Sequence, residues 1–160
     1  MEQQIIKIND KEFKQCPAPF ERAYVSRDGW VLTVRTNGTA CEPRQGRINI
    51  HSGGEIRPNA RITEVPCEPY YTKKGRLCHS RKMNIGQAVL YAWVGPYEEA
   101  GKDEWGNLRK TVDHINHNPF DNRVENLRWA SYKEQSQNTR KPVRLKDFTV
   151  QNDFEQFMEE

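Results

Sequence analysis

The chain has 160 residues, of which 35% are hydrophobic and 29% are charged, and its formal net charge is +3. This length predicts one domain, or one small domain with appendages, built around a modest core. No run of about 18 apolar residues occurs, which excludes a membrane protein of the helical class. The first residues lack the basic-then-apolar order of a signal peptide, so we expect an intracellular protein.

Charged residues are distributed unevenly along the chain. Residues 57–90 contain seven basic and two acidic residues, whereas residues 142–160 contain two basic and five acidic residues. The basic residues of the first segment are Arg57, Arg61, Lys73, Lys74, Arg76, Arg81 and Lys82. A basic body with an acidic tail suits a polyanionic partner, although a solvated surface explains the same charges.

The four cysteines, Cys16, Cys41, Cys67 and Cys78, are scattered and form no C-x-x-C pair. A structural zinc site needs tight pairs of Cys or His ligands. A disulfide framework conflicts with an intracellular setting. We therefore expect free, buried thiols, and a zinc-stabilised binding module is a poorly supported rival.

The first part of the chain predicts short strands separated by loops. Residues 1–22 predict a weak arm that ends at two prolines. Residues 23–34 predict a hairpin, because two runs rich in β-branched and aromatic residues flank a Ser-Arg-Asp-Gly turn. Residues 36–69 are rich in Gly, Pro, Asn and Arg, and they predict loops and a ragged sheet with strands near 47–50 and 61–65.

A strand pair and a helix follow. Residues 70–79 predict two strands around a Lys-Lys-Gly turn. From residue 85 to residue 93 apolar residues recur four apart, which is the helical period. Asn84 is the expected N-cap, and Gly95-Pro96 ends this helix. Residues 97–110 predict a polar connector.

The stretch 111–140 is polar, yet it begins with a run typical of a strand. It divides into a strand at 111–115, a loop at 116–125 whose Asn and Asp residues bond their own backbone, and a strand at 126–130. Ser131 and Glu134 form a capping box for a helix that runs to about residue 140.

The chemistry that this stretch predicts starts from Asp113 and His114. Neighbouring strand residues point to opposite faces, so Asp113 can face the following helix while His114 faces elsewhere. Gln135 and Asn138 are three residues apart and share a helix face. A carboxylate beside amide oxygens suits Mg²⁺ or Mn²⁺, and a nearby unbound imidazole can take a proton from water. Asn126 is expected to clamp the loop through its backbone. Together these features predict phosphodiester hydrolysis.

Four motifs resemble those of the HNH endonucleases, most closely the phage-type and homing-type branch. They are Val112-Asp113-His114-Ile115-Asn116, Asp121-Asn122-Arg123, Glu125-Asn126-Leu127-Arg128-Trp129-Ala130 and Gln137-Asn138. The resemblance implies a β-hairpin and a helix that grip one divalent metal ion. Residues 24–31 are similar to the signature of a DNA-binding module often attached to such nucleases, and residues 76–97 resemble the segment that usually precedes the nuclease motif.

The resemblance also implies a role for each matching residue. His114 would be the general base, Asp113 a metal ligand and Asn126 the central Asn that braces the loop and orients His114. The second metal ligand, commonly His or Asn in the family, falls on Gln135 here, which is a departure. Asn138, one turn later, is the alternative ligand. Asp121 and Asn122 are expected to form the loop, and His117 is expected to be a loop residue near the DNA at most.

Basic residues in two parts of the chain are the expected contacts to double-stranded DNA. Those on or beside the strand–helix unit are Arg128, Lys133, Arg140 and Lys141, and those that extend the footprint are Lys73, Lys74, Arg76, Arg81 and Lys82. A second copy of the chain is a further candidate partner, because one active site cuts one strand per visit.

We therefore predict a small α+β protein with a ββα-metal motif near its C-terminus. Residues 1–96 would form a β-rich DNA-binding or structural region, residues 97–141 the nuclease motif and residues 142–160 an acidic tail. The predicted function is a metal-dependent DNA endonuclease that uses Mg²⁺ or Mn²⁺ rather than Zn²⁺, in the host cytoplasm if it is phage-encoded. The alternative, which Gln135 supports, is a DNA-binding protein that keeps the fold without cleaving.

Overall fold

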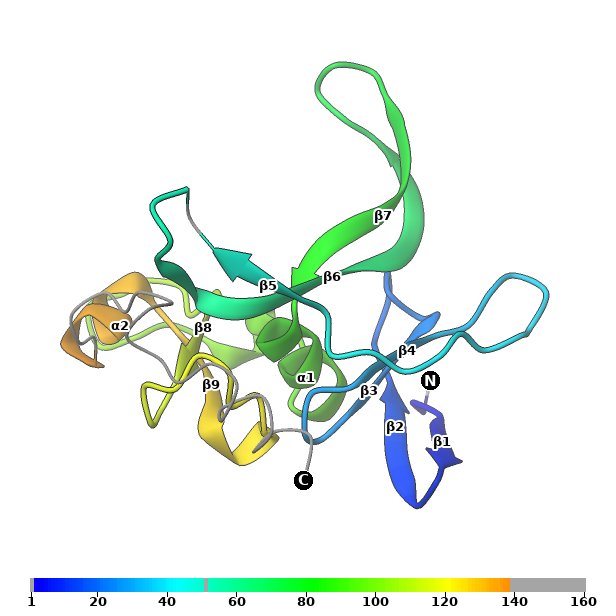
Figure 1. Ribbon diagram of the computed structural model, residues 1–160. Coiled ribbons are helices and arrows are strands. Elements are labelled where there is room, and N and C mark those ends of the chain that lie inside the picture. Colours follow the sequence, from blue (N-terminus) through cyan, green and yellow to red (C-terminus); the bar gives the residue numbers. More distant parts are fainter. Residues whose placement is uncertain (1, 51, 139–160) are drawn as a thin grey trace.

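The computed structural model describes residues 2–50 and 52–138 (Figure 1). It combines three antiparallel sheets with two α-helices, so the predicted mixture of helices and sheets is confirmed. None of the helices in this described part is long and apolar enough to cross a membrane. The acidic tail at 142–160 and the predicted DNA contacts Arg140 and Lys141 lie outside the described residues.

The N-terminal sheet has four strands in sequential order. They are β1 (Ile5–Ile8), β2 (Lys11–Gln15), β3 (Ala23–Ser26) and β4 (Val31–Thr33). The predicted hairpin at 23–34 is confirmed, but the predicted weak arm is wrong, because its residues form β1 and β2. These strands are joined by Asn9 and Asp10, whose φ angles are 49° and 65°. Two residues with positive φ make a tight hairpin turn, and Asn and Asp tolerate this conformation.

The second sheet has the order β5 (Arg47–Ile50), β6 (Ile56–Tyr71) and β7 (Leu77–Asn84). The expected strand near 61–65 is therefore part of a much longer strand. Proline is disfavoured within sheets because it cannot donate to the ladder. Strand β6 contains Pro58, Pro66 and Pro69. β5 pairs with it only as far as Ile62 and β7 only from Ile62 onwards, so each proline lies where β6 has one neighbour.

Helix α1 (Ile85–Trp93) lies in the middle of the molecule, beneath the second sheet (Figure 1). Its buried residues join the main hydrophobic core with residues of β3, β6, β7, β8 and β9. Each Val, Leu or Ile that is fully buried contributes roughly 1.5–3 kcal/mol relative to exposure. Asn84 occupies the N-cap position as predicted, although its side chain makes no capping hydrogen bond. The helix ends before Gly95, whose φ is 127°.

The C-terminal part of the described chain has the predicted order of strand, loop, strand and helix. Strand β8 (Thr111–His114) pairs with β9 (Leu127–Ala130), and α2 (Tyr132–Asn138) follows. The capping box is present, because the Glu134 N–H donates to Ser131 Oγ (3.1 Å) and the Ser131 N–H donates to Glu134 Oε1 (3.0 Å). The Trp129 indole donates to the Gly95 carbonyl (2.9 Å), which ties β9 to the end of α1.

All four cysteines are free, and two of them, Cys16 and Cys67, are buried. Burial raises the pKa of the Cys16 thiol to about 12, so this side chain stays protonated and packs as a small apolar group. Cys41 and Cys78 are only partly buried. The expectation of buried thiols is therefore confirmed for two of the four.

Candidate active site on the β8–β9 hairpin

Asp113 lies in the middle of β8, and its side chain turns towards α2. It is 7% exposed, and Arg128, its partner across the ladder, donates from Nε to Oδ2 at 2.8 Å. The Asn138 amide lies 3.2 Å from Oδ1 and 3.1 Å from Oδ2. The carboxylate is thus shared between a cation on the neighbouring strand and an amide on the helix.

His114, the next residue, points towards the loop between the two strands. Its side chain is 7% exposed, and Nε2 lies 2.8 Å from Asn122 Oδ1. Burial lowers the pKa of His114, while the Asn122 bond and the charges of Asp113 and Asp121 partly oppose this effect. The ordinary pKa of His is about 6.5, so a lowered pKa leaves the imidazole neutral at pH 7.

The loop between β8 and β9 is held together by its own polar side chains. Asn126 donates from Nδ2 to Asn116 Oδ1 (3.0 Å) and to the Asp121 carbonyl (2.9 Å), and its Oδ1 accepts from the Asn116 N–H (2.9 Å). Arg123 donates from two nitrogens to the Asp121 carboxylate, both at 2.8 Å. Burial alone would raise the pKa of Asp121, but the bonds from Arg123 and Asn116 lower it. The side chain of Asn126 therefore spans the loop that follows His114.

The two candidates for a second metal ligand occupy different places. Gln135 donates from Nε2 to Thr111 Oγ1 and to the Val112 carbonyl (3.0 Å), at the start of β8. Asn138, one turn later, contacts Asp113 itself. The structure therefore brings Asn138, rather than the amide nitrogen of Gln135, to the carboxylate.

The distance between Asp113 and Asn138 matches that between two ligands of one divalent cation. Adjacent oxygen ligands of an octahedral Mg²⁺ lie about 3 Å apart, since each bond is about 2.1 Å. The two side chains already have this separation, and rotating the amide exchanges Nδ2 for Oδ1. No group of three His, Cys, Asp or Glu residues that could hold a metal occurs within 2–50 and 52–138. The remaining ligands would have to be amide, water or phosphate oxygens.

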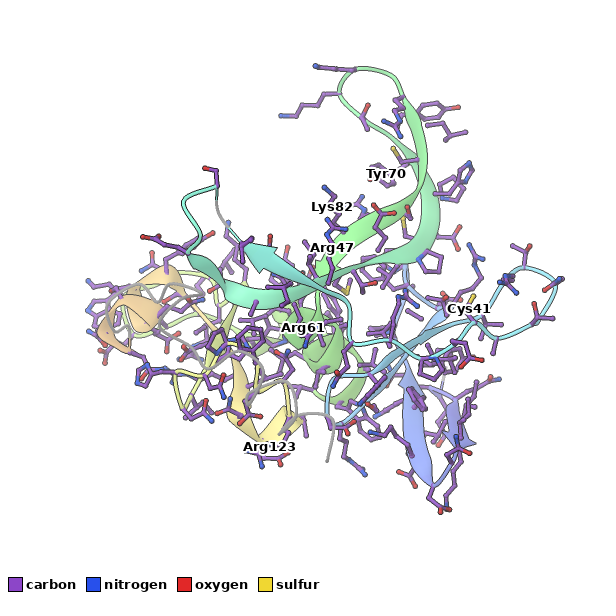
Figure 2. All side chains as sticks on the ribbon, viewed as in Figure 1. Cys41, Arg47, Arg61, Tyr70, Lys82 and Arg123 are labelled. Carbon is purple, nitrogen blue, oxygen red and sulfur yellow. The ribbon has the colours of Figure 1, made fainter. Side chains whose placement is uncertain are left out.

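The predicted DNA contacts fall into two groups. Near the hairpin, Arg128 binds Asp113 as described, and Lys133 lies 4.3 Å from the centre of the Trp105 ring. The other group, residues 73–82, lies on the β6–β7 hairpin, whose end extends away from the body (Figure 1). There Arg81 stacks on Tyr70 at 4.1 Å. Figure 2 shows Tyr70 on this end and Arg123 on the β8–β9 loop at opposite sides of the molecule.

Asn122 makes the one contact to His114 that sequence reasoning did not anticipate. It was expected to shape the loop, and its Asn-rich surroundings give no local signal that would distinguish it from its neighbours. Its contact to His114 depends on how the loop folds back over β8. Only the three-dimensional structure shows this.

Comparison with known proteins identifies the same part of the chain. Residues 92–137 match a family described as HNH endonuclease. No curated protein and no solved structure matched the chain. The matched segment contains β8, the loop, β9 and most of α2, and thus the side chains of Asp113, His114 and Asn126. This segment of the chain is therefore similar to the HNH endonuclease family.

Proposed function

We propose that the protein is a metal-dependent endonuclease that hydrolyses phosphodiester bonds in double-stranded DNA. The observation that carries this proposal is the placement of Asp113 and His114. They are neighbours on β8, yet one faces an amide of α2 and the other faces the polar loop. This arrangement places a cation site and a neutral base on adjacent residues. Both residues lie inside the segment that matches a nuclease family.

In this proposal His114 is the general base. The Asn122 Oδ1 atom accepts a hydrogen bond from Nε2, so Nε2 carries the proton and Nδ1 has a free lone pair. The lowered pKa keeps the imidazole neutral at pH 7. Nδ1 would take a proton from the water that attacks the phosphorus, and a base of this kind contributes about 10²- to 10⁴-fold to the rate.

Asp113 and Asn138 would hold the divalent cation, Mg²⁺ or Mn²⁺ by the oxygen character of these ligands. When bound, such a cation neutralises charge on the scissile phosphate and on the leaving 3′ oxygen. Arg128 is 45% exposed although it binds Asp113, so its guanidinium can also reach a phosphate of the substrate. Asn126 fixes the loop that carries Asn122.

The β6–β7 hairpin would provide a second contact to the duplex. Residues 70–84 contain five Lys and Arg residues and no Asp or Glu. Lysine and arginine on an extended hairpin match the phosphate backbone by charge, without reading sequence. One active site cuts one strand per visit, so cleavage of both strands would need a second copy of the chain or a second visit.

A nicking assay on supercoiled plasmid DNA with Mg²⁺ or Mn²⁺ tests the nuclease proposal. The wild-type protein should convert the plasmid to the open circle, and His114→Ala should reduce the rate by at least 100-fold. His117→Ala is the matched control, because this histidine lies in the same loop with a positive φ of 66° and has no catalytic role in the proposal. Rates like wild type are expected for it.

The rival function is a DNA-binding protein that keeps the fold without cleaving. It is favoured by the engagement of the Gln135 amide nitrogen with Thr111 and Val112 of β8, because the side chain at the position that the family uses for a ligand is then hydrogen-bonded to the strand. The rival is correct if the wild-type protein binds duplex DNA but leaves it intact with every divalent metal tested.

A further inference from the structure

The turn between β3 and β4 packs directly against the loop that carries Asn122. The Val124 N–H donates to the Arg27 carbonyl at 2.8 Å, so the end of the loop is hydrogen-bonded to this turn. Gly29, also in the turn, faces Asn122. A Cβ atom on Gly29 would lie 3.0 Å from Asn122 Cβ and 3.2 Å from Ile85 Cγ2. Any larger residue here would therefore push Asn122 or α1.

A second glycine borders Asn122 from α1. A Cβ atom on Gly86 would lie 3.3 Å from Asn122 Oδ1 and 2.9 Å from Val112 Cγ1. Asn122 is 5% exposed and thus occupies a space bounded by two glycines, while its Oδ1 faces His114 Nε2. The position of this oxygen is set by close packing as well as by its hydrogen bond.

The turn is fixed to the rest of the protein by several contacts of its own. Ser26 Oγ accepts from the Trp30 N–H (2.9 Å) and donates to Asp28 Oδ1 (2.5 Å). The Trp93 indole of α1 donates to the Val25 carbonyl (2.8 Å), and the Arg27 guanidinium lies 4.1 Å from the centre of the Trp93 ring. Sheet, turn and helix are therefore connected, and the turn can act as a rigid support for Asn122.

We propose that Asn122 is a positioning residue for His114, and that the turn at Ser26–Gly29 together with Gly86 is the wall that holds it in place. The inference rests on the proposed function. It extends the catalytic unit beyond the matched segment 92–137, because both walls come from outside that segment. The N-terminal sheet then supports catalysis directly, in addition to any contact that it makes with DNA.

Asn122→Ala and Asn122→Asp test the positioning role. Loss of the acceptor in Asn122→Ala should lower kcat about 100-fold, because small misplacements of a reacting group have effects of this size. KM and duplex affinity should remain unchanged. Asn122→Asp keeps an acceptor oxygen at the same place and should recover most of kcat. Equal losses in kcat for both variants, or a rise in KM that accounts for the loss, would overturn the role.

Nitrogen-15 NMR of the His114 ring provides a readout that does not depend on cleavage. The wild-type protein without DNA at high pH should show Nε2 protonated and Nδ1 bare, and Asn122→Ala should show a mixture of the two tautomers. Identical ring spectra would contradict the positioning role. If the wild-type protein cuts no DNA, the proposed function fails, while this comparison still decides whether Asn122 sets the state of His114.

Gly29→Ala tests the wall, and Gly38→Ala is its matched control. Both glycines have positive φ, 92° and 88°, so both substitutions cost backbone strain. A Cβ on Gly38 has no atom within 4 Å, whereas a Cβ on Gly29 meets Asn122. Gly29→Ala should lower kcat at least tenfold and Gly38→Ala should leave it unchanged.

A double variant distinguishes transmission through Asn122 from general damage to the fold. In an Asn122→Ala background the oxygen that faces His114 is already gone, so Gly29→Ala should lower kcat little further. If the kcat of the double variant falls by the product of the two single effects, Gly29 acts independently of Asn122. That result would overturn the proposal that Gly29 holds Asn122 in place. Melting temperatures of all variants identify any protein that fails to fold. If Gly29→Ala is such a protein, Gly86→Ala, at a glycine whose φ is not positive, tests the wall in its place.

Discussion

Two excursions from paired strands, the β8–β9 loop at 115–126 and the hairpin end of β6–β7 at 70–80, are built in opposite ways. The loop buries three of its polar side chains, and Asp121, Asn122 and Asn126 are 5–6% exposed. The hairpin end leaves even apolar side chains in solvent, since Tyr71 is 72% exposed and Leu77 is 44% exposed. The loop is closed by side-chain hydrogen bonds, whereas the hairpin end is closed by its backbone ladder and by a turn at Gly75, whose φ is 79°.

This difference determines what each region can do. Buried polar groups cost free energy unless all of them are hydrogen-bonded, so the loop holds its atoms in one arrangement or loses stability. The exposed hairpin end can change its side chains without disturbing the core. A position fixed to a fraction of an ångström suits a general base, and a tolerant charged surface suits contacts to a phosphate backbone.

Asp113→Ala has the largest expected effect. Without the carboxylate, the proposed cation loses a ligand and Asn138 loses its hydrogen-bond partner. Cleavage should therefore be abolished, with the rate reduced more than 100-fold. Duplex affinity, measured by fluorescence anisotropy without divalent metal, should remain within about threefold of wild type because the basic surface is intact. A parallel decrease in binding and cleavage would contradict the role of Asp113 as a metal ligand.

Asn126→Ala tests whether the β8–β9 loop contributes more to stability than the hairpin end of β6–β7 does. It removes three hydrogen bonds of the loop and deprives the carbonyl of the buried Asp121 of this donor, and an unsatisfied buried group costs about 1–3 kcal/mol. We expect the free energy of unfolding in urea to fall by about 2 kcal/mol or more. Replacing Lys73, Lys74 and Arg76 together by Ala, as the control, should change it by less than about 0.5 kcal/mol. Similar decreases in the free energy of unfolding of both variants would refute the contrast between a structurally constrained loop and a tolerant hairpin end.

Local signals were sufficient to predict the elements on which this contrast depends. The helical period of α1, the capping box of α2 and the β-branched and aromatic runs of β3 and β4 each involve residues close in sequence. Strands β1 and β2 were missed because β2 is mostly polar and the Asn9–Asp10 turn that joins it to the short β1 was not recognised. The length of β6 was missed because its prolines argue against a strand unless one edge is free.

The side-chain arrangement of the active site could be predicted only in part. The strand period placed Asp113 and His114 on opposite faces, and the helix spacing brought Asn138 and Gln135 into consideration. The helix spacing could not decide whether Asn138 or Gln135 lies at Asp113, because this depends on how α2 is placed against β8. The support of Asn122 by Gly29 joins residues far apart in sequence. Neither periodicity nor a sequence motif predicts such a contact, since it arises from the packing of the whole chain.

Neutralising the hairpin end should change DNA binding and leave the chemistry intact. With Lys73, Lys74 and Arg76 replaced by Ala, the slope of log affinity against log salt should become shallower by about 0.9 for each phosphate that the protein no longer neutralises. The control exchanges Lys for Arg and Arg for Lys at these positions, which keeps the charge, and should match wild type. The rate at saturating DNA should be the same for all three proteins. Equal slopes for the neutral and the charge-keeping variants would remove this region from the DNA interface.

The smallest expected effect separates Asn138 from Gln135 as metal ligands. Asn138 touches Asp113, so Asn138→Ala should raise the Mn²⁺ concentration needed for half-saturation severalfold, measured by calorimetry without DNA. Asn138→Asp should lower it, because a second carboxylate attracts the cation more strongly than an amide does. Gln135→Ala removes hydrogen bonds to β8 and should reduce stability with little effect on Mn²⁺ binding. A larger effect of Gln135→Ala than of Asn138→Ala would mean that α2 shifts by a turn when the metal binds, and that the position the family uses is restored.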